Sequence, residues 1–129
     1  MNEAALAALK NAHAPYSHRT IGASVLFNNG KYYTGCNIEN ASYGGTVCAE
    51  RVAIWKGISE CTSHVKITEV VVASLEESPW PPCGFCRQVM AEFCTEDTSV
   101  RLINAKGKEV LFKFKDLFPE AFRPNHLID

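Results

Sequence analysis

Residues 46–51 read Thr-Val-Cys-Ala-Glu-Arg, and residues 82–86 read Pro-Cys-Gly-Phe-Cys. Each segment has the composition of a helix start, because Thr46 is a favoured N-cap residue and Pro82 suits the position where a helix begins. The free N–H groups and the positive dipole end of such a start stabilise an anionic side chain. The two segments therefore predict two helices whose N-termini point toward one site.

The cysteines of these segments, Cys48, Cys83 and Cys86, have the spacing of metal ligands. A helix start lowers the pKa of a thiol, and the thiolate is the form that binds zinc. A Cys-x-x-Cys pair alone is also typical of redox dithiols and zinc ribbons, which stay open as alternatives. The segments offer a carboxylate, Glu50, where a structural site would have a fourth thiol or imidazole. Three thiolates and a water complete a tetrahedral catalytic site, so we expect one zinc ion per chain.

Length and composition indicate one globular domain, which we expect to span residues 1–129. A net charge of −1 without a basic run argues against a nucleic acid partner and favours a small substrate. The N-terminus lacks a targeting pattern and no apolar run has spanning length, so we expect a cytoplasmic protein without membrane contact. The three cysteines without metal-ligand spacing are expected to be buried or half-buried thiols: Cys36, Cys61 and Cys94.

The order of apolar patterns and turn signals predicts an α/β fold. Val70-Val71-Val72-Ala73 is a continuous apolar run, which suits a central strand buried on both faces. Around it we expect a helix over residues 2–14, a β-hairpin over 21–37, a helix from Thr46, a helix from Cys83, and a strand pair over 100–104 and 109–114. This order gives a mixed five-stranded sheet with helices on both faces.

Three motifs carry a resemblance to a known family. Residues 35–43 read Gly-Cys-Asn-Ile-Glu-Asn-Ala-Ser-Tyr, residues 48–51 read Cys-Ala-Glu-Arg, and residues 82–88 read Pro-Cys-Gly-Phe-Cys-Arg-Gln. Together they resemble the small homotetrameric cytidine deaminases over nearly the whole chain. The resemblance implies a three-layer α/β/α sandwich and zinc-dependent hydrolysis of cytidine and 2′-deoxycytidine to the uridines and ammonia, in pyrimidine salvage. It also implies a homotetramer whose subunits share their active sites.

Glu50 is the expected catalytic residue. It would take a proton from zinc-bound water, leaving hydroxide as the nucleophile, and deliver protons to the ring nitrogen and the departing ammonia. Three thiolates give the zinc centre a charge of −1, and the resemblance implies that Arg51 offsets it by donating hydrogen bonds to a ligand sulfur. By the same resemblance the backbone around Ala49 and Pro81 contacts the base.

Asn37 and Glu39 are the expected sugar-binding pair. They lie two residues apart at a strand end and so project the same way, and an amide with a carboxylate suits ribose hydroxyls. The sequence has no Gly-rich phosphate cradle, which favours a nucleoside over a nucleotide. Tyr43 ends the same motif, and we expect it at the pocket rim, at a neighbouring subunit or simply packed.

Two positions bear on the base itself. Phe122 matches the C-terminal phenylalanine that stacks on the base bound by another subunit in the resembled family. Arg19 stands where that family has a pocket phenylalanine, so it either stacks on the base or pairs with a carboxylate and leaves the pocket. The same chemistry on a modified cytosine nucleoside or an aminated nucleoside antibiotic is therefore the main alternative. The other two alternatives are an enzyme that edits polynucleotides and a non-catalytic zinc module.

Overall fold

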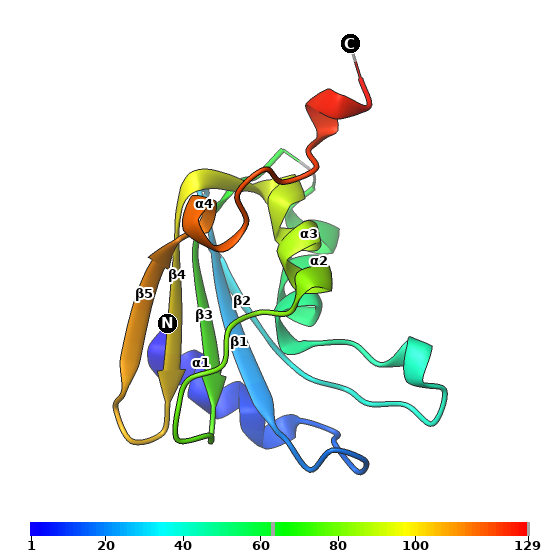
Figure 1. The fold of residues 1–129 in the computed structure, drawn as a ribbon, viewed down its shortest axis with the longest axis vertical. Coiled ribbons are helices and arrows are strands. Elements are labelled where there is room, and N and C mark those ends of the chain that lie inside the picture. The colour runs from blue at the N-terminus through cyan, green and yellow to red at the C-terminus, as the bar shows by residue number, and fades with distance from the viewer. Residues whose placement is uncertain (63, 129) are drawn as a thin grey trace.

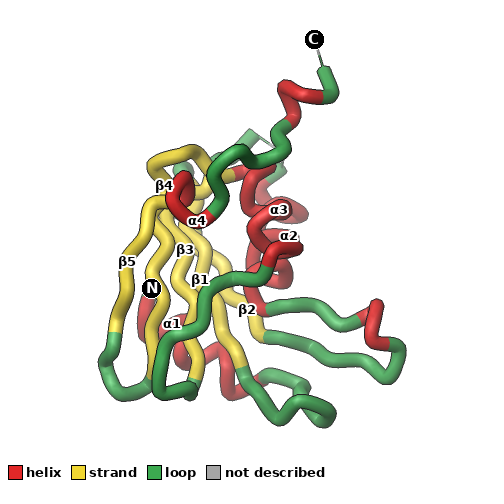
Figure 2. The backbone as a smooth tube through the Cα atoms, in the orientation of Figure 1, coloured by secondary structure: helices red, strands yellow, loops and turns green. Residues whose placement is uncertain are grey.

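The computed structural model describes residues 1–62 and 64–128 and has three layers (Figure 1). A five-stranded sheet in the order β2-β1-β3-β4-β5 forms the middle layer. Helix α1 covers one face of the sheet, and helices α2 and α3 cover the other (Figures 1 and 2). The α/β/α sandwich around a mixed five-stranded sheet that the sequence predicts is thus confirmed.

The strands pair as the turn signals predict. They are β1 (Ile21–Phe27), β2 (Tyr32–Cys36), β3 (Ile67–Ser74), β4 (Cys94–Asn104) and β5 (Glu109–Lys113). β1 pairs antiparallel with both β2 and β3, β3 pairs parallel with β4, and β4 pairs antiparallel with β5. β3 is central, as its apolar run predicts. Val70 and Val72 join the core beneath α2 and α3, whereas Val71 and Ala73 join the core beneath α1.

The helices differ from the predicted bounds, α1 at its end and α2 and α3 at their starts. They are α1 (Asn2–Ala8), α2 (Ala49–Cys61), α3 (Gly84–Phe93) and the short α4 (Phe114–Leu117). The first helix does not reach residue 14, because a 3-10 turn (Leu9–Asn11) ends it and Ala12 is extended. Thr46 does not cap α2. It follows a 3-10 turn (Tyr43–Gly45), and its hydroxyl accepts a hydrogen bond from the Asn40 N–H.

The predicted strands at residues 100–104 and 109–114 also shift. β4 begins at Cys94, because the Thr98 hydroxyl donates to the carbonyl of Ile67 and accepts from the Thr95 N–H across an irregular stretch of the pairing. β5 ends at Lys113, where α4 begins with the buried Phe114. Among the described residues, no helix is both long and apolar enough to cross a bilayer.

Gly22 and Gly35 let two helices lie directly on the sheet. A Cβ at Gly22 would overlap the carbonyl oxygen of Ala5 in α1. A Cβ at Gly35 would lie 2.6 Å from both Ala49 O and Ala53 N, in the first turns of α2. The missing side chains therefore mark close backbone approach. At Gly35 that approach fixes the helix that follows Cys48.

Replacing Gly35 with alanine is expected to lower the free energy of unfolding by about 1–3 kcal/mol, the usual cost of overpacking. The new methyl group meets helix backbone, which cannot move aside without shifting α2. Chemical denaturation measures the change. Gly44→Ala is the matched control, since nothing lies within 4 Å of a Cβ there. A Gly35→Ala chain as stable as that control would contradict the close contact.

Candidate metal centre and active site

The three motif cysteines converge at two helix starts. Cys48 is the N-cap residue of α2 and Cys83 is the N-cap residue of α3. Cys86 lies one turn further along α3, where its N–H donates to the Cys83 sulfur at 3.5 Å. Helix α2 thus begins at Ala49 and not at Thr46, and α3 begins at Gly84 and not at Cys83, but their N-termini do share one site.

The spacing of the sulfur atoms fits a tetrahedral metal. The three sulfurs lie within 4.8 Å of one another, and Cys48 Sγ lies 3.8 Å from Cys83 Sγ. Zinc–sulfur bonds of about 2.3 Å in a tetrahedron place two sulfurs about 3.8 Å apart. Cys36, Cys61 and Cys94 lie outside the cluster and are half-buried or buried. The donor set therefore suits zinc, with one coordination position left for water.

The cluster holds at least one thiol in its anionic form. The pKa of Cys48 is lowered to about 5, chiefly by a hydrogen bond with the Cys86 side chain and then by the Arg51 guanidinium. The pKa of Cys86 is raised, because its thiol donates that hydrogen bond to Cys48 and because it is buried. A thiolate is thus available for a cation even before the other two protons leave.

Arg51 lies against the cluster. Its Nη2 donates to the Cys48 sulfur at 3.5 Å, and its guanidinium lies 4.0 Å from the ring centre of Phe85 and 5.8 Å from that of Trp55. The side chain is largely buried, and its Nε has no hydrogen-bond partner within the described residues. A buried positive charge at this position balances the negative charge that three thiolates would bring.

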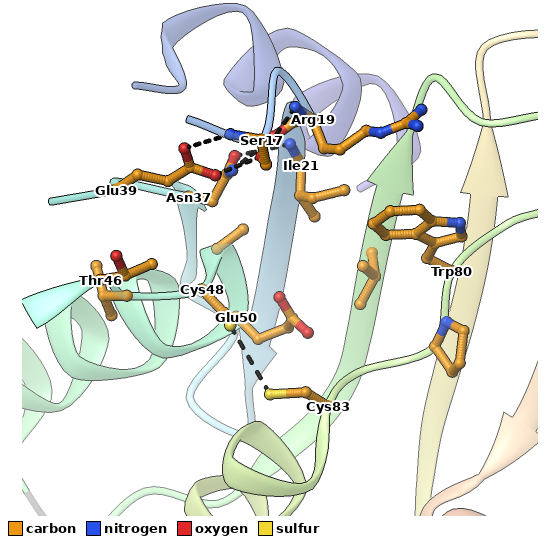
Figure 3. A pocket seen from close by; sticks show the side chains of 14 residues that line it. Ser17, Arg19, Ile21, Asn37, Glu39, Thr46, Cys48, Glu50, Trp80 and Cys83 are labelled. Atoms are coloured by element: carbon orange, nitrogen blue, oxygen red, sulfur yellow. Dashed lines mark hydrogen bonds between the residues drawn. The ribbon is translucent and has the colours of Figure 1, made fainter. Parts of the chain in front are cut away.

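Glu50 is the buried carboxyl group of the site. It lies in the first turn of α2 and only 4% of it is exposed. Figure 3 shows its carboxyl group directed into the cavity, beside Cys48 and Cys83. Burial, followed by the nearby Cys48 thiolate, raises the pKa of Glu50 to about 7. A carboxyl group with such a pKa can both accept and donate a proton near neutral pH.

A cavity of about 330 Å³ joins this cluster to the rest of the site. Such a volume lies in the range of small-molecule pockets. Cys48, Ala49, Glu50 and Cys83 line one end. Asn37 and Glu39 line the other end (Figure 3). The predicted catalytic and metal-binding residues and the predicted sugar-binding pair therefore line the same cavity.

Asn37 and Glu39 hold the segment that precedes β1. The Asn37 side chain accepts from the Ile21 N–H at 2.8 Å and donates to the Arg19 carbonyl at 2.7 Å. The Glu39 carboxylate accepts from the N–H groups of Tyr16 and Ser17, both at 3.0 Å, and from the Ser17 hydroxyl. These bonds, above all those from Ser17, lower the pKa of Glu39 and keep it ionised. Both side chains thus position the pocket wall as well as facing the cavity.

Three further predicted residues, Arg19, Tyr43 and Phe122, differ in whether they line the cavity. Arg19 lines the cavity, but its Nη1 lies 2.6 Å from Glu76 Oε1, so the guanidinium pairs with a carboxylate as one of the two expectations had it. Tyr43 is 77% exposed, touches the ring of Tyr16 edge-on and does not line the cavity. Phe122 is also exposed, stacks on His126 and does not line the cavity of its own chain.

Sequence reasoning missed several wall residues. Ser17, Ile21, Val72 and Trp80 line the cavity. The signal for Trp80 was its place three residues before Cys83 in the proline-rich segment 78–82, which carries it to the same site. Ile21 and Val72 belong to paired strands, so only the register of the sheet brings them together.

The family model for the cytidine and deoxycytidylate deaminase zinc-binding region matches residues 1–102. The chain belongs to this deaminase family. The matched region includes all three cysteines of the cluster, which confirms the expected zinc cofactor.

Relatives in this deaminase family match over nearly the whole chain. Cytidine deaminases from Halalkalibacterium halodurans and Sporosarcina psychrophila are each 42% identical, covering 97% and 93% of this chain and 93% and 87% of their own. The crystal structure of cytidine deaminase from Burkholderia pseudomallei is similar with a TM-score of 0.88 and 40% identity, covering 94% of this chain and 95% of that one. The family resemblance of the sequence is therefore confirmed.

Proposed function

We propose that this protein hydrolyses cytidine and 2′-deoxycytidine to the uridines and ammonia. One observation carries the proposal: a buried carboxyl group, Glu50, lies beside three zinc-binding thiols at one end of a nucleoside-sized cavity. The cytidine deaminases that the chain resembles support the substrate. The enzyme is thus a hydrolase that cleaves the C–N bond of a cyclic amidine.

The residues of the chain supply the proton transfers. Zinc, when held by Cys48, Cys83 and Cys86, supplies a Lewis acid that makes a bound water acidic near neutral pH. Glu50 would accept one proton of that water as the water oxygen bonds to the amino-bearing carbon of the base, and would pass it to the ring nitrogen. Glu50 would then take the remaining proton of the added hydroxyl group and deliver it to the amino group, so that the carbonyl of the uridine forms, the C–N bond breaks and ammonia leaves. Arg51 stabilises the negative charge on the Cys48 sulfur throughout.

The far end of the cavity favours a neutral sugar. Glu39 is ionised and retains acceptor capacity, so it suits ribose hydroxyls and repels a phosphate. We assign Asn37 and Glu39 to the sugar, and the backbone at Ala49 and Pro81 to the base. Arg19 is drawn toward Glu76, so position 19 places no aromatic side chain in the pocket where the resembled family has a phenylalanine. Modified cytosine nucleosides are the second candidate substrates for that reason.

A substrate panel tests this assignment. Loss of ultraviolet absorbance would be followed for cytidine, 2′-deoxycytidine, 5-methylcytidine, cytidine monophosphate and a cytosine-containing single-stranded oligonucleotide. We expect the unmodified nucleosides to react fastest and the phosphorylated compounds to react poorly. Faster turnover of the oligonucleotide, with salt-sensitive binding, would overturn the nucleoside assignment.

The cysteines support a proposal for the cellular setting. All six cysteines are free thiols, which suits the reducing cytoplasm. We place the enzyme there, as one domain over residues 1–129, in the salvage of pyrimidine nucleosides. Zinc without any deaminase activity would instead support a non-catalytic zinc module.

We expect a homotetramer with shared active sites. Trp55, Phe85 and Phe122 are large side chains that are 48%, 63% and 52% exposed, and closed symmetric assemblies commonly cover such groups. Sedimentation would show a tetramer. Mixing a Glu50→Ala chain with a Phe122→Ala chain should restore part of the activity, because Phe122 lies outside the cavity of its own chain. An active monomer, or mixed chains without recovery, would contradict the shared site.

A further inference from the structure

Trp80 is the aromatic side chain of the cavity wall. It is the one aromatic group among the described residues that line the cavity, and it is 41% exposed. In Figure 3 the indole lies on the side of the cavity opposite Glu39, at the level between Arg19 and Cys83. A half-exposed indole beside a pocket offers a large flat apolar face with no partner from its own core.

The ion pair between Arg19 and Glu76 lies next to this indole. The Arg19 guanidinium carbon lies 6.0 Å from the ring centre of Trp80, within the range of a cation–π contact. Arg19 Nη1 also pairs with Glu76 Oε1 at 2.6 Å. In Figure 3 the guanidinium extends away from Glu50, alongside the indole. Arg19 therefore packs against Trp80 at the cavity wall, and the interior of the cavity is left to a ligand.

The backbone that carries Glu76 is itself fixed. The side chain of Asn104, which is 4% exposed at the end of β4, donates to the carbonyl oxygens of Glu76 and Glu77 at 3.2 and 2.8 Å. Asn104 also accepts from the N–H groups of Lys106 and Lys108. A chain of contacts thus runs from the end of β4 through Glu76 and Arg19 to Trp80.

We propose that Trp80 is the residue of the same chain on which the substrate base stacks, and that the Arg19–Glu76 pair positions it. The inference rests on the proposed function, since it takes the ligand to be a pyrimidine nucleoside. The indole lines the same cavity as Glu50 and Cys83, where the reacting base must lie, while Tyr43 and Phe122 lie outside this cavity of their own chain. Apolar Ile21 and Val72 extend the same wall.

Intrinsic fluorescence tests the stacking directly. The chain has two tryptophans, Trp55 and Trp80. Titrating the zinc-loaded enzyme with uridine, the product, should quench fluorescence in the wild type and in Trp55→Phe, but not in Trp80→Phe. Calorimetry on the same samples measures uridine binding independently of the indole.

Steady-state kinetics tests the energetic role. Trp80→Ala should lower kcat/KM for cytidine by about 5- to 150-fold, the range expected when a stacked aromatic side chain is removed from a base. Trp80→Phe should keep most of the wild-type kcat/KM, because a phenyl ring can still stack. Glu76→Gln should raise KM severalfold with kcat nearly unchanged, because it frees Arg19 without touching the reacting atoms. Glu77→Gln is its matched control, since Glu77 is an exposed neighbouring carboxylate.

The outcomes separate the two proposals. If cytidine is turned over and uridine binds, but neither quenching nor KM depends on Trp80, the stacking role is wrong and the deaminase function stands. If Trp80→Ala matters but Glu76→Gln behaves like Glu77→Gln, the positioning role of the ion pair is wrong. If cytidine is not turned over and uridine does not bind, the proposed function fails, and the stacking role fails with it.

Discussion

Replacing Glu50 with alanine is expected to slow cytidine deamination by at least about 10³-fold while the chain keeps its zinc. Glu50 is the buried carboxyl group in the cavity beside Cys48 and Cys83, and its pKa of about 7 suits repeated proton transfer. Glu50→Gln should lose nearly as much activity, because an amide keeps the shape but cannot shuttle protons. Absorbance kinetics and zinc analysis on the same samples measure both effects.

The Glu50 variants should remain folded. Burial disfavours the charged form of this carboxyl group, so removing it takes away no net stabilising charge. Glu92→Ala is the matched control, since Glu92 is exposed on α3. A Glu50→Ala enzyme that turns over cytidine at a rate near that of the control would show that another group moves the protons.

Zinc loss should follow removal of any one cluster cysteine. Cys48→Ala, Cys83→Ala or Cys86→Ala leaves two sulfurs, too few to hold the metal in a three-thiolate site. We expect zinc content to fall from about one ion per chain to near zero, with activity below detection. The melting temperature should also fall, because a metal that binds only the folded chain stabilises it.

The other three cysteines provide matched controls for this experiment. Cys36, Cys61 and Cys94 lie outside the sulfur cluster, so their alanine variants should keep zinc and activity. Cys94 is buried beneath α3, and its variant should lose some stability but not the metal. A ligand variant that keeps full zinc, or a control variant that loses it, would contradict the assigned ligand set.

The sequence determined the parts of this molecule that depend on local pattern. The apolar run around Val71 predicts a strand buried on both faces, since no other arrangement hides four successive apolar side chains of a strand. Short turns fix the antiparallel pairs at either end of the sheet. The cysteine spacing and Glu50 predict the metal centre, because their chemistry is specific to a few positions.

The start of α2 differs from the prediction because tertiary contacts override the local sequence pattern. Thr46 is a good N-cap by composition, but the helix begins at Ala49, because residues 43–45 form their own 3-10 turn and Val47 pairs with Ile38 in an isolated bridge. Cys48 thereby gains an extended backbone at the N-cap, and its sulfur faces Cys83. A helix propensity argument does not include such a competing tertiary contact.

Contacts between distant residues also lay outside local reasoning. Arg19 and Glu76 are 57 residues apart, and only the pairing of β1 with β3 brings the ends of these strands together. The roles proposed for Tyr43 and Phe122 would involve a neighbouring subunit, and they stay predictions.

Zinc content and cytidine turnover, measured on one purified preparation, test the central claim most directly. We expect about one zinc per chain and rapid loss of cytidine absorbance. Activity should disappear when a chelator removes the metal and return when zinc is restored. A fully active preparation without zinc, or a zinc-loaded preparation that leaves cytidine unchanged, would contradict the claim of a zinc-dependent cytidine deaminase.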